Sequence, residues 1–200
     1  MRMKKTTVLF ILLFLLQFIS VSSAIEISCG EKCTWSVKNN ILTISSENEE
    51  MRDFYSDEEV PWISEIKTVE KIILRRIRSV GQKAFQHAEK LKSVDFGENI
   101  QKIGKGAFYN SRLEEIEIPS SVISIESSAF EENKLLKNVK FSESSGKANL
   151  KEIGEKAFKN CFALETITLP DSVETIGRKM FEGCKMLAKV SFGKELKEIE

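Results

Sequence analysis

A short motif of the form apolar–Gly–x–x–Ala–Phe returns five times along this chain and constrains its fold more than any other feature. Its most regular copy is Ile153-Gly154-Glu155-Lys156-Ala157-Phe158. The phenylalanines of the five copies are Phe85, Phe108, Phe130, Phe158 and Phe181. They are spaced 23, 22, 28 and 23 residues apart, and the longest spacing contains a polar insertion after Phe141. Self-similarity with a period of 20–29 residues is typical of solenoids, in which each unit buries its apolar face only against its neighbours.

Each repeat divides into a turn half and a strand half. In the turn half, we expect glycine to supply a positive φ, alanine to allow close approach and phenylalanine to fill the interior. In the strand half, the segment 164–169 (Leu-Glu-Thr-Ile-Thr-Leu) alternates apolar with polar residues, which is the period of a half-buried strand. Pro170 then ends the strand, because proline cannot donate to a ladder. Stacked copies predict a mostly β solenoid with a parallel strand stack and a phenylalanine column in its core.

The complete repeat at 153–173 reads Ile-Gly-x-x-Ala-Phe-x-x-Cys-x-x-Leu-x-x-Ile-x-Leu-Pro-x-Ser-Val. It resembles the BspA-type leucine-rich repeat, also called the treponemal-pattern repeat, and the resemblance covers roughly residues 69–200. It implies an α/β-type repeat solenoid that is mostly β. The preceding segment, with Trp35 and Trp62, looks like the small β-rich module that caps such repeats in many members. We therefore expect a capping segment at 25–66 and leucine-rich repeats at 67–200, about five to six units with the last one incomplete.

The resemblance also implies a function. Members of this family are typically secreted or surface-displayed proteins of bacteria and protists that live on mucosal surfaces. It implies binding to an extracellular or cell-surface protein, and adhesion to host cells, neighbouring cells or matrix. Composition and periodicity by themselves indicate only an exported repeat scaffold, because a fold does not determine a function.

The first residues have the pattern of a signal peptide. Basic residues in 1–5 precede an apolar run at 8–19, and small residues at 22–24 suit cleavage after Ala24. The run of about 12 residues is shorter than the roughly 20 that span a bilayer. We expect a signal peptide at 1–24, a product that is secreted or on the extracellular cell surface, and no membrane span after cleavage.

The charge balance bears on the class of partner. The full chain has 30 basic and 30 acidic residues, and residues 1–24 contain three of the basic ones. The processed chain therefore has 27 against 30, a balance of −3. This balance argues against nucleic acid as a partner.

The four cysteines form two pairs in the sequence. Cys29 and Cys33 are candidates for a local disulfide in an oxidising compartment, and a zinc site is the weaker alternative because no further ligands are nearby. Cys161 and Cys184 each follow the repeat phenylalanine by three residues. We interpret them as small buried core residues, and a bridge between them stays open as the alternative.

A candidate partner-binding face follows from the strand halves. Polar residues of the strands alternate with apolar ones and should point outward in a grid. The candidate residues are Lys92, Asp95, Glu114, Glu115, Glu117, Lys137, Asn138, Lys140, Glu165, Thr166 and Thr168. The second repeat contributes an acidic row beside a basic row from the third. Two interpretations stay open: the rows neutralise each other, or they form a polar patch that docks a charged protein.

Catalysis has little support in the sequence. His87 is the only histidine, and no Gly-rich phosphate loop, His-Glu-x-x-His pair or EF-hand spacing is present. We expect no enzymatic activity, no metal and no cofactor.

Three hypotheses of function remain. The first is an adhesin or surface-recognition protein. The second is a self-assembling extracellular structural component, because residues 195–200 begin a sixth unit that lacks the Gly, Ala and Phe; self-association would use this open C-terminal end. The third is a glycan-binding or small-ligand-binding module.

Overall fold

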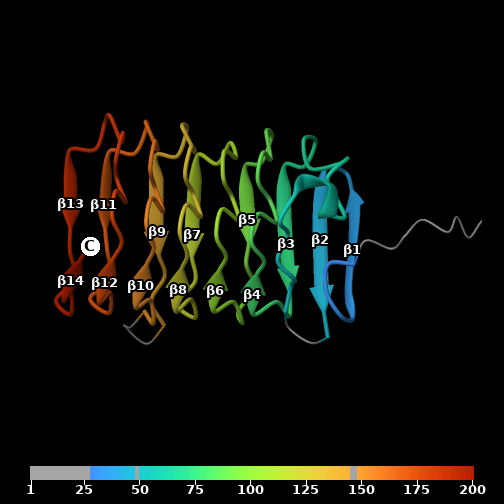
Figure 1. Ribbon diagram of the computed structural model, residues 1–200, viewed down its shortest axis with the longest axis horizontal. Coiled ribbons are helices and arrows are strands. Elements are labelled where there is room, and N and C mark those ends of the chain that lie inside the picture. Colours follow the sequence, from blue (N-terminus) through green and yellow to red (C-terminus); the bar gives the residue numbers. More distant parts are fainter. Residues whose placement is uncertain (1–27, 48–49, 145–147) are drawn as a thin grey trace, which may run out of the picture.

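The chain folds into an elongated stack of coils, as the computed structural model shows (Figure 1). The structure describes residues 28–47, 50–144 and 148–200. The signal peptide predicted at 1–24 lies outside these residues. Strands are short and mostly parallel, and no α-helix occurs in the described residues. The predicted fold, a mostly β leucine-rich repeat solenoid with a parallel strand stack, is confirmed.

The N-terminal part is a β-hairpin joined to the stack. Strands β1 (Cys33–Lys38) and β2 (Ile41–Ser46) pair antiparallel across a two-residue turn. Its residues, Asn39 and Asn40, have φ values of 51° and 61°, as a tight hairpin turn of this kind requires. Strand β2 then pairs in parallel with β3 (Lys71–Arg75), so one sheet runs from the hairpin into the repeats. A single 3₁₀ turn, η1 (Asp57–Glu59), lies in the connection.

Two rows of strands run along the repeats, and each coil contributes one strand to each row (Figure 1). The first row continues from β3 with β5 (Ser93–Asp95), β7 (Glu115–Ile118), β9 (Asn138–Phe141), β11 (Thr166–Thr168) and β13 (Lys189–Ser191). The second row is one six-stranded parallel sheet of two-residue strands: β4 (Ser79–Val80), β6 (Lys102–Ile103), β8 (Ser124–Ile125), β10 (Glu152–Ile153), β12 (Thr175–Ile176) and β14 (Glu198–Ile199). Equivalent residues pair across coils, as Ile103 does with Ile125.

The predicted phenylalanine column forms the centre of the core. Ring centroids of successive members lie 5.3–6.2 Å apart from Phe85 to Phe181. Trp62 extends the column into the N-terminal part, with its ring stacked 5.5 Å from that of Phe85. Trp35 lies edge-on to Trp62 at 6.1 Å and is 36% exposed. Both tryptophans therefore pack where a cap would close the core.

The glycine of the repeat has a different role from the one expected. The left-handed residue of the turn lies two positions later and is usually not glycine: Lys83, Ser128, Lys156 and Lys179 all have φ between 56° and 58°. The motif glycines have no positive φ. At Gly177, an added Cβ would lie 2.3 Å from the Glu155 amide nitrogen of the preceding coil. The glycine is needed because neighbouring coils approach closely there.

A buried donor recurs three residues after each of the last four phenylalanines. Asn133 Nδ2 donates to the Phe108 carbonyl at 2.7 Å, and Cys161 Sγ donates to the Phe130 carbonyl at 3.3 Å. Ser111 and Cys184 make the same contact to the carbonyls of Phe85 and Phe158. These bonds give each of the four carbonyl groups a side-chain donor from the next coil. Cys161 and Cys184 are free thiols, the first buried and the second half-buried.

Candidate interaction surface

The outward side chains of β5, β7, β9 and β11, with those of the residues just before these strands, form one continuous polar face, which we call the strand face. All eleven residues predicted for it are exposed: Lys92, Asp95, Glu114, Glu115, Glu117, Lys137, Asn138, Lys140, Glu165, Thr166 and Thr168. The alternation along β7 explains this placement, because Ile116 and Ile118 are buried while Glu115 and Glu117 point away from the core. The parallel register then aligns each coil with the next.

Some charges of the strand face are paired between coils. Lys140 Nζ lies 3.2 Å from a carboxylate oxygen of Glu117, which also accepts a hydrogen bond from Ser142. These contacts, first that of Ser142 and then that of Lys140, lower the pKa of Glu117. Lys92 Nζ lies 2.6 Å from Glu70 and lowers its pKa in the same way. Opposite charges on neighbouring coils therefore neutralise each other in two pairs, Glu117 with Lys140 and Glu70 with Lys92.

Other charges of the strand face are not paired. Glu114 and Glu115 make no ion pair within the part of the chain that the structure describes, and both are exposed. The Lys137 side chain has no such partner either; only its amide contacts Glu114, by donating to the carbonyl oxygen at 2.8 Å. These side chains keep their hydration and can meet a partner without first breaking an internal ion pair.

Two open grooves cross the strand face. One, of about 750 Å³, follows the ends of β5 and β7 and is lined by Asp95, Glu117 and several serines. The other, of about 510 Å³, lies between β9 and β11 and includes Lys140 and Thr168. Both are shallow and polar, unlike the enclosed, mostly apolar pockets that hold small ligands. They suit contact with a larger molecule better than with a small one.

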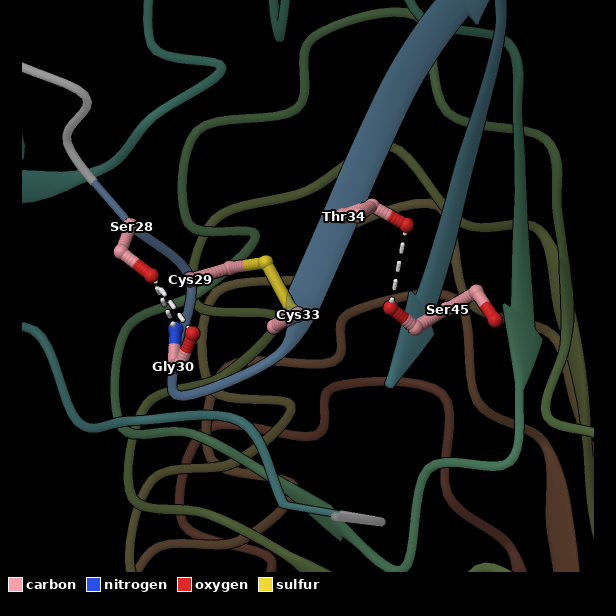
Figure 2. Close-up of a disulfide and its surroundings, with 6 residues drawn as sticks. All are labelled: Ser28, Cys29, Gly30, Cys33, Thr34 and Ser45. Carbon is pink, nitrogen blue, oxygen red and sulfur yellow. Dashed lines mark hydrogen bonds between the residues drawn. A yellow bond between two sulfur atoms is a disulfide. The ribbon is translucent and has the colours of Figure 1, made fainter. Parts of the chain in front are cut away.

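The predicted cysteine pair lies at the N-terminal end of the stack, away from these grooves. Cys29 and Cys33 form a disulfide with a Cα–Cα distance of 5.5 Å (Figure 2). The loop that it closes is also held by Ser28, whose hydroxyl donates to the Gly30 carbonyl and accepts from the Gly30 amide. Thr34 Oγ1 donates to the Ser45 carbonyl across the hairpin at 3.4 Å. The disulfide fixes the start of β1.

The remaining candidates for chemistry are isolated from one another. His87 lies in a turn with φ 61°, where its Nδ1 contacts the side-chain nitrogen Nδ2 of Asn110 at 3.1 Å and its ring meets Tyr109 edge-on. Burial raises the pKa of the Cys161 thiol, so it is not a nucleophile at neutral pH. No group of three or more His, Cys, Asp or Glu that could hold a metal ion occurs in residues 28–47, 50–144 and 148–200. Over the same residues, no helix is long and apolar enough to cross a membrane.

One partly exposed aromatic side chain was not part of the sequence prediction. Phe162 lies in the turn that leads into β11, with Lys185 Nζ 4.5 Å and Lys134 Nζ 5.7 Å from its ring centroid. In the repeat pattern, Phe162 occupies a position marked x, directly after Cys161, for which the pattern names no residue type. Only the stacking of three coils shows that two cations flank it.

Comparisons with known proteins agree with this architecture. The family described as "BspA type Leucine rich repeat region" matches residues 64–149 and 145–200, in six copies. No curated protein matches the chain significantly.

Among solved structures, the pneumococcal vaccine antigen PcpA is similar with 25% identity and a TM-score of 0.55, over 82% of this chain and 47% of the antigen. The leucine-rich repeat protein TpLRR of T. pallidum has 19% identity and a TM-score of 0.53, over 86% of this chain and 82% of that one. A leucine-rich repeat protein from Bacteroides ovatus has 17% identity and a TM-score of 0.51, over 82% and 53%. The chain thus spans about half the length of the pneumococcal structure.

Proposed function

We propose that this chain, which belongs to the BspA-type leucine-rich repeat family, is an exported protein-binding module that uses its strand face for adhesion to an extracellular or cell-surface protein. The observation that carries the proposal is the strand face itself, where eleven aligned polar side chains are exposed across four coils. Export is supported by the signal-peptide pattern at 1–24. The disulfide between Cys29 and Cys33 suits an oxidising compartment.

The size and chemistry of the strand face favour a protein as the partner. A stable protein interface buries about 1,600 Å² in total, which several stacked coils can supply. Unpaired charges at Glu114, Glu115 and Lys137 would steer a partner with complementary charges and set its orientation. The strand face has no exposed aromatic ring of the kind on which a sugar would stack, so glycan binding has less support.

Binding of the full chain to immobilised matrix proteins and to intact host cells tests the proposal. In the key variant, Glu114, Glu115 and Glu117 are changed to Lys. We expect saturable binding by the parent chain and a loss of at least about tenfold in affinity for the variant, because like charges would then face the partner.

The control variant reverses three exposed carboxylates elsewhere, Glu31, Glu58 and Glu152. It changes the net charge equally and should bind like the parent. Equal losses in both variants would mean that binding follows net charge and not the strand face. Absence of protein and cell binding, together with a mass that rises with concentration in light scattering, would favour self-assembly and refute adhesion.

A further inference from the structure

A second surface, separate from the strand face, gathers positive charge on a chain whose basic and acidic residues are equal in number. It is the ridge of turns that lead into the first row of strands, and we call it the turn ridge. Its residues are Lys90, Arg112, Lys134, Leu135, Phe162 and Lys185. All are exposed except Phe162, which is partly exposed. Each of the five coils contributes at least one of them.

The turn ridge is in register along the stack. The Arg112 amide donates to the Ala88 carbonyl of the preceding coil at 3.3 Å. The Met186 amide donates to the Phe162 carbonyl at 3.3 Å, which places Lys185 beside Phe162. Lys134 reaches the same ring from the coil before. The order along the axis is therefore cation, cation, cation, aromatic, cation.

Acidic neighbours cancel only part of the positive charge of the turn ridge, at Lys134. Glu89 lies in the ridge but pairs with Lys67 at 3.4 Å, and Glu132 pairs with Lys134 at 3.1 Å. Arg112 and Lys185 have no ion pair within residues 28–47, 50–144 and 148–200. Cations that lie over an aromatic ring, beside an exposed leucine, resemble the composition of protein interfaces, where aromatic residues and arginine are enriched.

The spacing of the coils indicates what shape of partner fits. Successive core rings are 5.3–6.2 Å apart, so the ridge side chains repeat at a similar distance. In an extended peptide, every second side chain points the same way, at about 6.6–6.8 Å. An acidic residue at alternate positions would therefore fall within about 0.4–1.5 Å of the spacing of each coil, an offset that long lysine, arginine and glutamate side chains can take up. Opposite Phe162, the peptide would need an apolar residue between its acidic residues.

We propose that the turn ridge binds an extended acidic segment of a partner protein, with acidic residues at alternate positions and one apolar residue opposite Phe162. This inference rests on the proposed protein-binding function but places a contact outside the strand face. The nearest competing ligand is an anionic polysaccharide, which would use the cations but has no apolar side chain for Leu135 and Phe162.

The test is a fluorescence titration of the full chain with the labelled peptide Glu-Ser-Glu-Ser-Glu-Ser-Leu-Ser-Glu. The comparison probes are the same peptide with Gln for Glu and a heparin oligosaccharide. We expect the acidic peptide to bind, to weaken as salt rises, and to bind more tightly than either comparison probe.

Variants locate the peptide on the turn ridge. Lys134→Glu with Lys185→Glu should weaken binding at least about tenfold, and Phe162→Leu, which keeps an apolar side chain, by about two- to fivefold. Lys38→Glu with Lys105→Glu reverses two exposed lysines elsewhere and should change affinity by less than about twofold. Circular dichroism melts confirm that each variant is folded.

Three results would overturn the inference: no peptide binding, tighter binding of heparin than of the peptide, or an equal loss in the ridge and control variants. The strand-face variant (Glu114→Lys, Glu115→Lys and Glu117→Lys) should still bind the peptide. If the parent chain binds cells but not the peptide, the turn-ridge inference is rejected and strand-face adhesion stands. If the parent chain binds the peptide but not cells, strand-face adhesion is rejected and the turn-ridge inference stands.

Discussion

At the scale of single residues, the turn of each repeat makes two separate demands on the backbone. One position needs a left-handed conformation and is filled by Lys83, Gly106, Ser128, Lys156 and Lys179 in successive coils. Another position, two residues earlier, lies where neighbouring coils approach closely and is filled by glycine in four of the five coils, with Glu126 in the third. A glycine in this turn can therefore be essential or replaceable, depending on which of the two positions it occupies.

Substitution at these two positions should have different effects on stability. Gly177→Ala places a Cβ 2.3 Å from the Glu155 amide nitrogen, so the coils must separate. We expect a loss of about 1–3 kcal/mol in the free energy of unfolding, typical of overpacking. Gly106→Lys is the matched comparison, because its Cβ would make only van der Waals contacts, at 3.8 and 3.9 Å, and lysine already occupies the equivalent position in three coils. Urea unfolding should show a smaller loss for this variant, about 1 kcal/mol, which is the cost of a side chain on a left-handed backbone. Similar losses for both variants would contradict the assignment.

The left-handed residues show where sequence patterns stop being informative. Alternation of Ile116 and Ile118 with glutamates predicts the strand and its outward face, since burial has the same period. Lysine at a positive φ carries no such signal, because lysine avoids that conformation in general. It is imposed by the hydrogen bonds between coils, such as that from the Lys156 amide to the Arg178 carbonyl at 2.9 Å. The donor role of Cys161 was missed for the same reason: its acceptor belongs to another coil.

At the scale of elements, the N-terminal hairpin and its connection continue the bonding pattern of the coils with different groups. In the repeats, the amides of the first four core phenylalanines donate to a carbonyl of the next coil, as Phe85 does to Ala107 at 2.8 Å. Before the first repeat, the indole nitrogen of Trp62 donates to the Ala84 carbonyl at 2.8 Å. A side chain thus supplies the bond that a further coil would supply from its backbone. This explains why Trp62 is buried while Trp35 is not.

Trp62→Phe should therefore weaken the junction between the N-terminal part and the repeats. The Ala84 carbonyl would lie buried without a donor, which costs about 1–3 kcal/mol in the free energy of unfolding. Trp35→Phe, at a partly exposed ring, should cost less. Hydrogen exchange should show faster exchange in β2 and β3 for the first variant. Equal protection in both variants would contradict a bonding role for the indole.

Ion pairs between coils make part of the stability depend on pH. Lys151 Nζ and Lys197 Nζ lie 2.7 Å and 2.5 Å from the Glu174 carboxylate. Hydrogen bonds from Lys151 first and Lys197 second lower the pKa of Glu174 from 4.5 to about 2. Because the folded protein has the lower pKa, this contribution is complete above pH 4.5 and is lost as the pH falls toward 2.

Thermal melts between pH 5 and 2 should show this loss. Glu174→Gln should be less stable than the parent at pH 5, and the difference should shrink toward pH 2. Glu152→Gln, at an exposed carboxylate of the neighbouring strand, serves as the control and should follow the parent across the range. A constant difference for Glu174→Gln at every pH would show that the pair contributes through packing and not through charge.

At the scale of the whole molecule, the solenoid is nearly one-dimensional. Within the column, each phenylalanine ring stacks on the rings of the adjacent coils, and strand pairs join residues of adjacent coils. Stability is then a sum of coil and interface contributions. For this reason, the number of repeats, their spacing and the phenylalanine column of the core could be predicted from the sequence. The turn ridge could not, because its residues share no motif position and meet only when coils stack.

Phe130→Ala tests this picture. The ring of Phe130 stacks at 5.4 Å against both Phe108 and Phe158. Its removal should cost about 3–5 kcal/mol in the free energy of unfolding. In a one-dimensional stack, hydrogen exchange should accelerate most in the coils of Phe108 and Phe158 and least in β1 and β2. Uniform acceleration along the chain would indicate a single cooperative unit instead.

The parallel pairing of each coil with its predecessor also bears on how the chain folds during synthesis. Pairing partners such as Ile153 and Ile176 are separated by only one repeat in the sequence. Each new coil can therefore dock as soon as its own residues have left the ribosome, with the preceding coil as a template. No contact has to wait for a distant segment, which limits the time that unpaired strand edges spend exposed to other chains. The hairpin precedes the coils in the sequence, so each coil can be added to it in the order of the chain.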